Sequence, residues 1–323
     1  MASNLNIPFT VEILTGGTFT IPAGSRNVIY KLNNNDWVTQ TSNLTLNVGA
    51  GDTIQIKSSS TTSNWNSVKF SSGSNCMFKL SGNINSLLSK DNFEEITTLA
   101  DTAFRCTFQD CTGLTSAEDL LLPATTLGDR AYAALFQRCS NLTIAPLIPN
   151  ATLSSNSLEY MFDSCSKLNN IRCLLTDISA NQCTLYWTNS VSSTGTFYKA
   201  TEMENWTRGR DGIPNNWAIV NYIQFSISID TLNLSASGGS GTVDVSSENP
   251  WTASTQSDWI SITPISGLTD ATVTISTNYN SFEQRTGTVT FTDGEDTIDL
   301  TVYQKGNTLI PFKKMYKNGN RIN

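Results

Sequence analysis

One recurring pattern in the middle of the chain constrains the fold more than any other feature. The spacing Phe-x2-Cys-x2-Leu begins at Phe108, Phe136 and Phe162, at intervals of 28 and 26 residues. The segments PATTL at 123–127 and PNATL at 149–153 keep the same phase. A period of this length indicates a solenoid, in which each unit buries its apolar face against its neighbours. The sequence therefore predicts ladders of Phe, Cys and Leu along stacked units.

Each unit is predicted to combine helical and extended segments. The segments 129–139 (DRAYAALFQRC) and 154–165 (SSNSLEYMFDSC) look helical, with Asp or Ser able to cap their starts. The segments 114–123 (LTSAEDLLLP) and 142–149 (LTIAPLIP) are expected to pair as short strands. The class predicted for this part is a short α/β solenoid.

The pattern decays after Cys173 and ends in GIPNNWAIV at 212–220. Such decay indicates an atypical terminal unit that covers the exposed end of the stack. Large apolar side chains suit that role better than ligand stacking, which stays the alternative for Trp187, Trp206 and Trp217.

The segments on both sides of the repeats alternate apolar and polar residues. Within 7–57, runs such as FTVEIL and DTIQIK between Gly and Asn turns predict a small β-sandwich-like domain. Within 224–304, turns every eight to twelve residues predict a seven- or eight-stranded antiparallel sandwich. We therefore expect a mainly β, multidomain protein: 1–88 N-terminal β domain, 89–220 repeats with a cap, 221–304 sandwich, 305–323 basic tail.

The charge distribution argues against nucleic acid as the main ligand. The chain has a formal net charge of -7. Residues 224–304 hold ten carboxylates against Arg285 alone, whereas 305–323 hold five cations and no acid. Binding to a phosphate backbone needs clustered Lys and Arg. The basic tail is too small to reverse this balance.

The composition removes most catalytic chemistry. The chain has no histidine, which excludes Ser-His-Asp and Cys-His catalysis and HExxH zinc sites. Paired carboxylates keep glycoside cleavage open, but no diagnostic context surrounds the three clusters Glu94-Glu95, Glu118-Asp119 and Asp293-Glu295-Asp296. We expect a non-enzymatic protein without catalytic residues, cofactor or metal.

Seven cysteines, an odd number, show no paired CxxC spacing. We interpret them as free thiols that act as small buried wedges in the repeats, with a metal or redox role as the alternative. Folding in a reducing compartment would permit free thiols. No signal peptide and no apolar run of the roughly 20 residues that span a bilayer is visible in the sequence.

The repeat motif resembles a known family. The FxxC(T/S)xLT and YxxMFxxC elements of residues 99–172 resemble BspA-type leucine-rich repeats, which are common in Bacteroidetes surface proteins. The flanking FKLSGNINSLL and GIPNNW segments extend the resemblance over roughly 70–220. It implies a leucine-rich-repeat solenoid with an adhesive role.

Residues 230–305 resemble a BACON domain through LNLSASGGSGTVDVSS, the Trp251 and Asp258-Trp259-Ile260 pair, RTGTVTF and the closing VYQKG. The resemblance implies an immunoglobulin-like sandwich that contacts bacterial or mucosal glycans. Trp251 and Trp259 lie at core positions of the alternation, so packing competes with sugar stacking. Polar strand-end loops offer a second set of contacts. The candidate ligand-binding residues are Trp251, Trp259, Asn278, Tyr279 and Asn280.

BACON modules also occur in virion proteins of crAss-like Bacteroidetes phages, and the ending IPFKKMYKNGNRIN is similar to terminal segments of phage tail and fibre proteins. The resemblance implies a multicopy fibre or decoration protein, made in host cytoplasm, whose partners are other capsid or tail proteins. A Bacteroidetes cell-surface adhesin without its export segment is the alternative. The tail is either disordered or a particle anchor, and the candidate anchor residues are Lys313, Lys314, Tyr316, Lys317 and Arg321.

Overall fold

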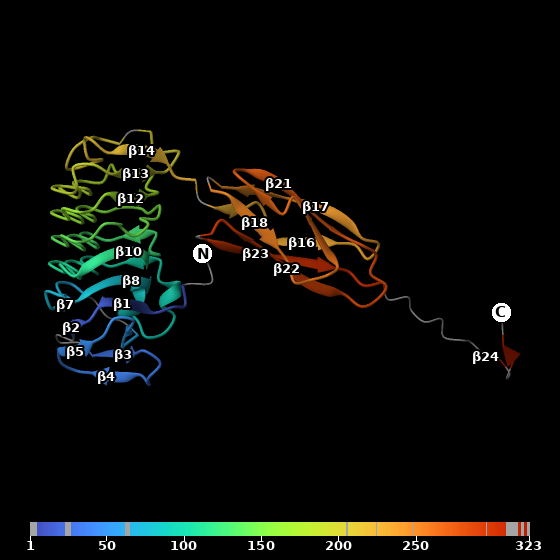
Figure 1. The fold of residues 1–323 in the computed structure, drawn as a ribbon, viewed down its shortest axis with the longest axis horizontal. Helices are drawn as coiled ribbons and strands as arrows, with labels where there is room; N and C mark the ends of the chain where they lie inside the picture. The colour runs from blue at the N-terminus through green and yellow to red at the C-terminus, as the bar shows by residue number, and fades with distance from the viewer. Residues whose placement is uncertain are drawn as a thin grey trace. The chain divides into compact units, whose positions relative to one another are not determined.

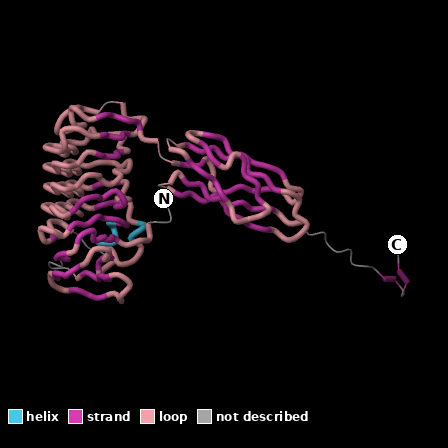
Figure 2. Tube along the Cα trace, in the orientation of Figure 1, coloured by secondary structure: helices cyan, strands magenta, loops and turns pink. Residues whose placement is uncertain are grey.

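The computed structural model describes residues 5–22, 27–61, 65–204, 206–223, 225–247, 249–294 and 296–307, together with the backbone of 316–317 and 320–321. The chain divides into two compact units, Met1–Tyr222 and Ile223–Asn323. Strands and turns make up nearly all of both units (Figure 2). The prediction of a mainly β, multidomain protein is confirmed.

The first unit begins with a six-stranded sheet in the order β10-β8-β1-β6-β3-β4. Alternating residues of these strands point into one core, as the sequence pattern requires. A second sheet, β5-β2-β7, closes the other side of that core. The strands are β1 (Phe9–Thr15), β2 (Gly17–Ile21), β3 (Val28–Leu32), β4 (Val38–Gln40), β5 (Leu44–Val48), β6 (Thr53–Ser58), β7 (Ser71–Ser72), β8 (Met77–Asn83) and β10 (Leu114–Leu121).

The repeats continue this sheet without a break. Strand β8 pairs antiparallel with β1 and parallel with β10. Parallel bridges at Ile144 connect β10 to β12, and β13 and β14 follow (Figure 1). The segments expected as separate N-terminal and repeat domains therefore share one sheet and one core. The remaining elements of this unit are η2 (Ile84–Leu87), η3 (Phe93–Glu95), β9 (Thr98–Leu99), β11 (Thr126–Leu127), β12 (Asn170–Cys173), β13 (Thr196–Lys199) and β14 (Ala218–Asn221).

The predicted ladders of Phe and Cys are present. Phe108 stacks on Phe136 at 5.5 Å between ring centroids, and Phe136 stacks on Phe162 at 5.7 Å. The thiols of Cys139 and Cys165 donate to the Phe108 and Phe136 carbonyls, each at 3.0 Å. Each Phe therefore stacks on its counterpart in the next coil, and each of these two Cys residues bonds to the Phe of the preceding coil. The stacking follows the sequence period, while membership of the leucine-rich-repeat family stays a prediction.

The helices expected at 129–139 and 154–165 are wrong. Both segments are series of tight turns (Figure 2). Every fourth residue is left-handed, with φ of 54° at Arg130, 54° at Ala134 and 61° at Arg138. Alternate N–H groups leave the segment altogether, and Ala134 N–H donates to the Glu159 carbonyl of the next coil. A right-handed α-helix needs neither feature, since its N–H groups bond within the segment.

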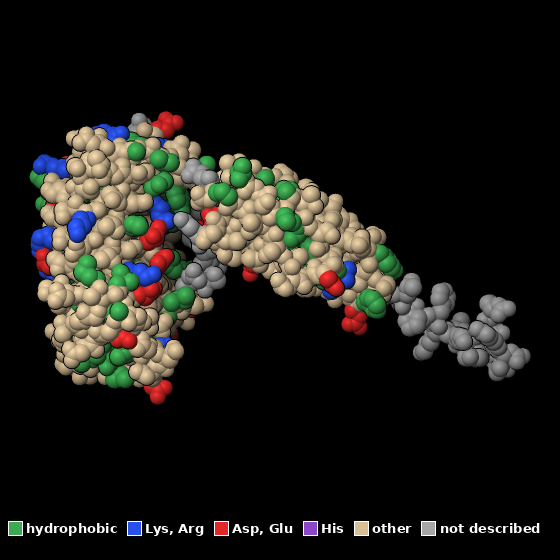
Figure 3. All heavy atoms as spheres, viewed as in Figure 1, with side chains coloured by type: hydrophobic (Ala, Val, Ile, Leu, Met, Phe, Trp, Pro, Cys, Tyr) green, Lys and Arg blue, Asp and Glu red, His purple; other side chains and the backbone are tan. Residues whose placement is uncertain are grey.

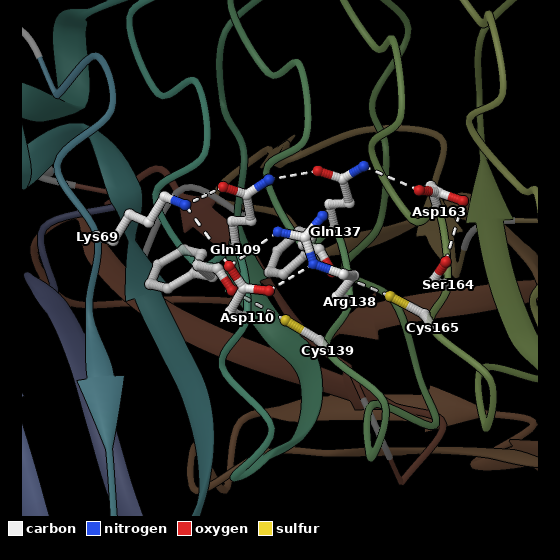
Figure 4. Close-up of polar contacts among 11 residues, drawn as sticks. Lys69, Gln109, Asp110, Gln137, Arg138, Cys139, Asp163, Ser164 and Cys165 are labelled. Carbon is white, nitrogen blue, oxygen red and sulfur yellow. Dashed lines mark hydrogen bonds and ion pairs between the residues drawn. The ribbon is translucent and has the colours of Figure 1, made fainter.

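A polar ladder follows the outer edge of these turns (Figure 4). The Lys69 ammonium donates to Gln109, Gln109 donates to Gln137, and Gln137 donates to Asp163 at 2.8 Å. Asn189 completes the ladder with a 2.7 Å bond to Asp163. These side chains satisfy one another from coil to coil. We therefore assign the ladder to fixing the register of the stack.

The last coil covers the end of the stack with the predicted tryptophans. Trp187 is fully buried, and its indole N–H donates to the Gly212 carbonyl at 2.9 Å. The Trp217 indole N–H donates to the Ser192 carbonyl at 2.8 Å. Trp206 stacks on Trp187 at 5.4 Å between centroids. Packing, rather than an open stacking surface, occupies all three indoles.

The second unit is a two-sheet sandwich around its own core. The sheets have the orders β15-β17-β21-β19 and β16-β23-β22-β18-β20. The predicted fully antiparallel pairing is wrong at β16, which runs parallel to β23. The strands are β15 (Ser226–Ile227), β16 (Thr231–Leu234), β17 (Gly239–Ser246), β18 (Trp251–Ser254), β19 (Ile260–Thr263), β20 (Ser266–Gly267), β21 (Ala271–Thr277), β22 (Arg285–Thr292) and β23 (Thr297–Gln304).

Glycine substitutions at two neighbouring alanines test whether residues 129–139 form turns rather than a helix. Ala133 and Ala134 are both buried, but only Ala134 has a positive φ. Glycine relieves left-handed strain and weakens right-handed backbone. We expect Ala134→Gly to be more stable than Ala133→Gly by about 1 to 2 kcal/mol in denaturant unfolding. Equal losses of stability in the two variants would indicate a helix and contradict the turns.

Candidate functional site

Trp251, a predicted ligand contact, is a core residue. Its side chain is 1% exposed, and its indole N–H donates to the Thr269 carbonyl at 2.8 Å. A Cβ atom at Gly267 would lie 2.7 Å from the indole, so the ring fills the space that this glycine leaves. Trp251 also contacts Phe291, with 6.3 Å between ring centroids. It has no surface on which a ligand could stack.

Trp259 lies at the surface of the sandwich, immediately before β19. Its ring packs partly against the core. The Arg285 guanidinium lies 4.2 Å from the ring centroid, within the range of a cation–π contact. Arg285 Nε also donates to Gln304 Oε1 at 2.9 Å. Trp259 thus packs partly against the core and has Arg285 over its ring, and its role in sugar stacking stays a prediction.

Asn280 holds the loop of residues 278–284, which connects β21 to β22. The side chain is 1% exposed. Its amide donates to the Glu283 carbonyl at 2.8 Å and to the Lys305 carbonyl at 3.2 Å, and its oxygen accepts from the Phe282 N–H at 3.1 Å. Because these bonds use the amide within the fold, Asn280 shapes the loop and does not itself face a ligand.

The loop that Asn280 holds presents two aromatic rings to solvent. Tyr279 is 54% exposed and Phe282 is 78% exposed. The Tyr279 hydroxyl accepts a hydrogen bond from the Asn307 side chain, which orients the ring. Phe282 was not among the predicted contacts. Its position in the polar run NSFEQR was the available sequence signal, since a large apolar residue in a short loop has little core to enter.

Gln304 connects the loop that carries Asn278 and Tyr279 to Arg285, which lies over Trp259. Its amide nitrogen donates to the Asn278 carbonyl at 2.7 Å, while its oxygen accepts from Arg285. We call the resulting patch the strand-end surface, formed by Trp259, Asn278, Tyr279, Phe282 and Arg285.

Trp251 belongs to the opposite end of the sandwich. It packs on Phe291, six residues along β22 from Arg285, which is about 20 Å at the rise of a strand. The predicted set of five residues therefore separates into three surface residues (Trp259, Asn278 and Tyr279), one core residue (Trp251) and one buried loop residue (Asn280).

The strand-end surface is weakly charged. Arg285 is the one cation of residues 224–304, and Glu283 lies in the adjacent loop. The visible face of this unit carries few Lys, Arg, Asp or Glu side chains and several apolar ones (Figure 3). Exposed aromatic rings beside hydroxyl and amide groups suit a neutral, hydroxyl-rich ligand better than a highly charged one.

The proposed anchor lies mostly beyond what the structure describes. Lys313 and Lys314 are outside the described residues. The backbone at Tyr316–Lys317 (β24) pairs antiparallel with Asn320–Arg321 (β25). The anchor role of Tyr316, Lys317 and Arg321 stays a prediction.

The thiols lack the exposure and the lowered pKa of reactive cysteines. All seven cysteines are free and buried. Burial raises the pKa of Cys111, Cys165 and Cys173 to about 12 in each case, so the thiols stay protonated near neutral pH. Across the described part of the chain, no group of three or more Cys, Asp or Glu side chains is placed to hold a metal. Helices in that part are also too short to cross a membrane.

Residues of two of the three carboxylate clusters have partners within the fold, as ion pairs in one cluster and as a turn hydrogen bond in the other. Glu118 pairs with Arg172 at 3.3 Å, and Asp119 with Lys79 at 4.0 Å. Asp293 accepts from the Asp296 N–H at 2.7 Å in the β22–β23 hairpin, and Glu295 is outside the described residues. The third cluster, Glu94 and Glu95, lies in the first turn of η3.

The fold and this patch define a β protein with a sandwich that presents an aromatic loop. The family model described as "BACON: Putative binding domain, N-terminal" matches residues 249–305, which include that loop. These residues are therefore similar to a BACON domain, as the sequence predicts. No curated protein sequence matches the chain.

Two solved structures are similar to part of the chain. One is a Bacteroides ovatus GH5 xyloglucanase in complex with a XXXG heptasaccharide, with 22% identity over 29% of this chain and 21% of that chain, at a TM-score of 0.25. The other is WR4, a C. elegans MSP family member, with 13% identity over 25% of this chain and 96% of that chain, at a TM-score of 0.20. This chain thus matches about a fifth of the length of the xyloglucanase.

The two asparagines of the loop should respond differently to substitution. Asn280→Ala removes three partly buried hydrogen bonds and leaves the carbonyls of Glu283 and Lys305 without this donor. We expect it to lower the free energy of unfolding by about 1 to 3 kcal/mol. Asn278→Ala, at an exposed position, should change it by less than about 0.5 kcal/mol. Denaturant unfolding measures both, and equal effects would contradict the assigned roles.

Proposed function

We propose that the protein is a non-enzymatic binding protein that contacts carbohydrate through the strand-end surface of its BACON domain. The observation that carries this proposal is the pair of exposed rings, Tyr279 and Phe282, on a loop fixed by buried Asn280. Large apolar rings exposed together on one loop indicate an interaction surface. A loop already held in place loses little conformational freedom on binding, which favours affinity.

The chemistry of the surface suits a sugar. The ring faces of Tyr279 and Phe282 offer apolar contact to the C–H faces of a pyranose. Asn278 and the Tyr279 hydroxyl supply hydrogen-bonding groups beside the rings, as small-ligand sites require. Such a contact is weak by itself. Several copies on one surface would raise avidity without any new contact.

The absence of enzymatic activity is part of the proposal. The sequence offers no histidine, and Glu118 and Asp119 lie in ion pairs. A surface hollow of the first unit, about 310 Å³, has Asp177 in its lining. Hydrogen bonds from Ser179 lower the pKa of Asp177. A general acid for glycoside cleavage needs a raised pKa, so this hollow suits binding rather than hydrolysis.

We further propose that the protein is a structural component of a phage virion, in which the repeat unit and the BACON domain face outward and residues 305–323 dock on a capsid or tail protein. Seven free thiols support folding in a reducing cytoplasm. The five cations of the tail suit an acidic docking partner. A cell-surface adhesin of Bacteroidetes is the second candidate, favoured by the same resemblance of the repeats.

A double substitution tests the sugar contact. In the full chain, Tyr279→Ala with Phe282→Ala should lower binding to glycans that the native protein selects from an array by about tenfold or more, equal to about 1.4 kcal/mol. The matched control is Tyr303→Ala, another partly exposed tyrosine of this sandwich, 37% exposed. A blank array for the native protein, or equal losses in both variants, would remove the lectin role.

Tail deletion tests the particle role. Removal of residues 308–323, which keeps Lys305 and Asn307 to hold the loop of residues 278–284, should leave the fold of both units intact and strongly reduce incorporation into particles, measured by quantitative mass spectrometry of purified virions. Replacement of the five cations with Gln in the full-length tail separates charge from length. Unchanged incorporation of the truncated protein would overturn the anchor, and detection only in bacterial envelopes would favour the adhesin.

A further inference from the structure

An exposed tryptophan on the first unit lies beside two lysines, far along the chain from the BACON domain. Trp37 is 39% exposed, and its neighbour Val38 is 46% exposed. The Lys57 ammonium lies 4.9 Å from the centroid of the Trp37 ring, and the Lys31 ammonium lies 5.5 Å away. We call these three residues the Trp37 cluster. One exposed indole thus faces two cations at cation–π distance.

The sheet positions both lysines on one face. Lys31 lies in β3 and Lys57 in β6, which are adjacent antiparallel strands. Their neighbours Tyr30 and Ile56 are directly paired and pack into the core. Because side chains alternate along a strand, Lys31 and Lys57 both lie on the opposite, outward face. Two of the three residues of the cluster, the lysines, therefore occupy regular sheet positions.

The turn before Trp37 is also fixed. Asn33 has a φ of 54°. Its side chain makes two hydrogen bonds where the neighbouring strand β6 begins. Its amide nitrogen donates to Asp52 at 2.9 Å, and its oxygen accepts from the Thr53 N–H at 2.8 Å. These bonds also occupy Asp52, a nearby carboxylate. Trp37 is therefore presented from a preorganised turn.

The two lysines lack acidic partners. Within the described ranges, neither Lys31 nor Lys57 makes an ion pair, although the protein carries a net charge of -7. Other lysines of the same unit do so, with Lys79 pairing with Glu12 at 3.0 Å and Lys90 with Asp91 at 3.7 Å. Two neighbouring, like-charged ammonium groups repel each other. An anion bound beside both ammonium groups would offset this repulsion.

We propose that the Trp37 cluster is a second saccharide site, selective for acidic sugars. The indole contacts the apolar face of a sugar ring, and the Lys31 and Lys57 ammonium groups bind the carboxylate or sulfate that the sugar carries. The site differs in selectivity from the strand-end surface, which has one cation, Arg285, already engaged with Trp259 and Gln304. It also lies in a different compact unit.

A polyphosphate such as nucleic acid is the less suitable partner. Its affinity rests on many cations, each neutralising one phosphate. Two lysines in an acidic protein provide few such contacts, and Asp36 lies next to Trp37 in the sequence. The exposed indole contributes apolar contact area that a phosphate backbone would not use. Ring stacking combined with a local anion therefore favours an acidic saccharide.

Titration calorimetry of the full chain with an oligogalacturonate tests the site, with a neutral oligosaccharide of equal length for comparison. We expect the acidic oligosaccharide to bind more tightly. Lys31→Gln with Lys57→Gln should weaken its binding at least tenfold and leave binding of the neutral one unchanged. Trp37→Ala should weaken both. The two variants change different residues, so a folding defect in one leaves the other as a test.

The matched control is Lys90→Gln with Lys167→Gln, which removes the same charge elsewhere on the first unit and should alter affinity less than twofold. Equal weakening in this control, or no binding of the acidic oligosaccharide by the native chain, would overturn the proposal. Polyphosphate that competes as well as oligogalacturonate at equal charge would also overturn it. Tyr279→Ala with Phe282→Ala should leave this binding intact, which separates the site from the strand-end surface.

Discussion

Hydrogen bonding between successive coils is the constraint on which the first unit depends. In the turn segments, alternate N–H groups bond outside their own coil, as Phe136 N–H does with the Met161 carbonyl at 2.9 Å. A single coil therefore leaves half of these donors and one face of its Phe ladder unsatisfied. The N-terminal sheet begins the stack because its strand β8 pairs with β10 of the repeats. The tryptophan-rich last coil ends the stack.

The same constraint explains which parts of the fold could be predicted from sequence. The period of the Phe, Cys and Leu positions encodes contacts between coils directly, so the ladders were predictable. The conformation within each coil was not. The residues Ala131–Phe136 are good helix formers with an apolar spacing, and local preference favours a helix there. The bonds that decide otherwise come from residues 25 positions later, such as Glu159 for Ala134.

Prediction of the candidate site was limited in a similar way. Alternation along β18 correctly made Trp251 a core position. Loop composition directed attention to residues 278–280, whose role as ligand contacts stays a prediction. The difference between Asn278 and Asn280 depends on Lys305, 25 residues from Asn280, whose carbonyl accepts from the buried amide. No local sequence pattern predicts the hydrogen bond between Asn280 and Lys305. The Trp37 cluster was missed for the same reason, since Lys31 and Lys57 meet only through strand pairing.

The two proposed surfaces follow one physical logic. Each places aromatic rings on backbone that is already fixed, by Asn280 in the BACON domain and by Asn33 in the first unit. Fixed rings lose little entropy on binding, but a few rings bury little area, so each contact is weak. Because one chain links the surfaces, binding at one raises the effective concentration of ligand at the other. A polymer that carries both neutral and acidic sugars would therefore be held more tightly than either sugar alone.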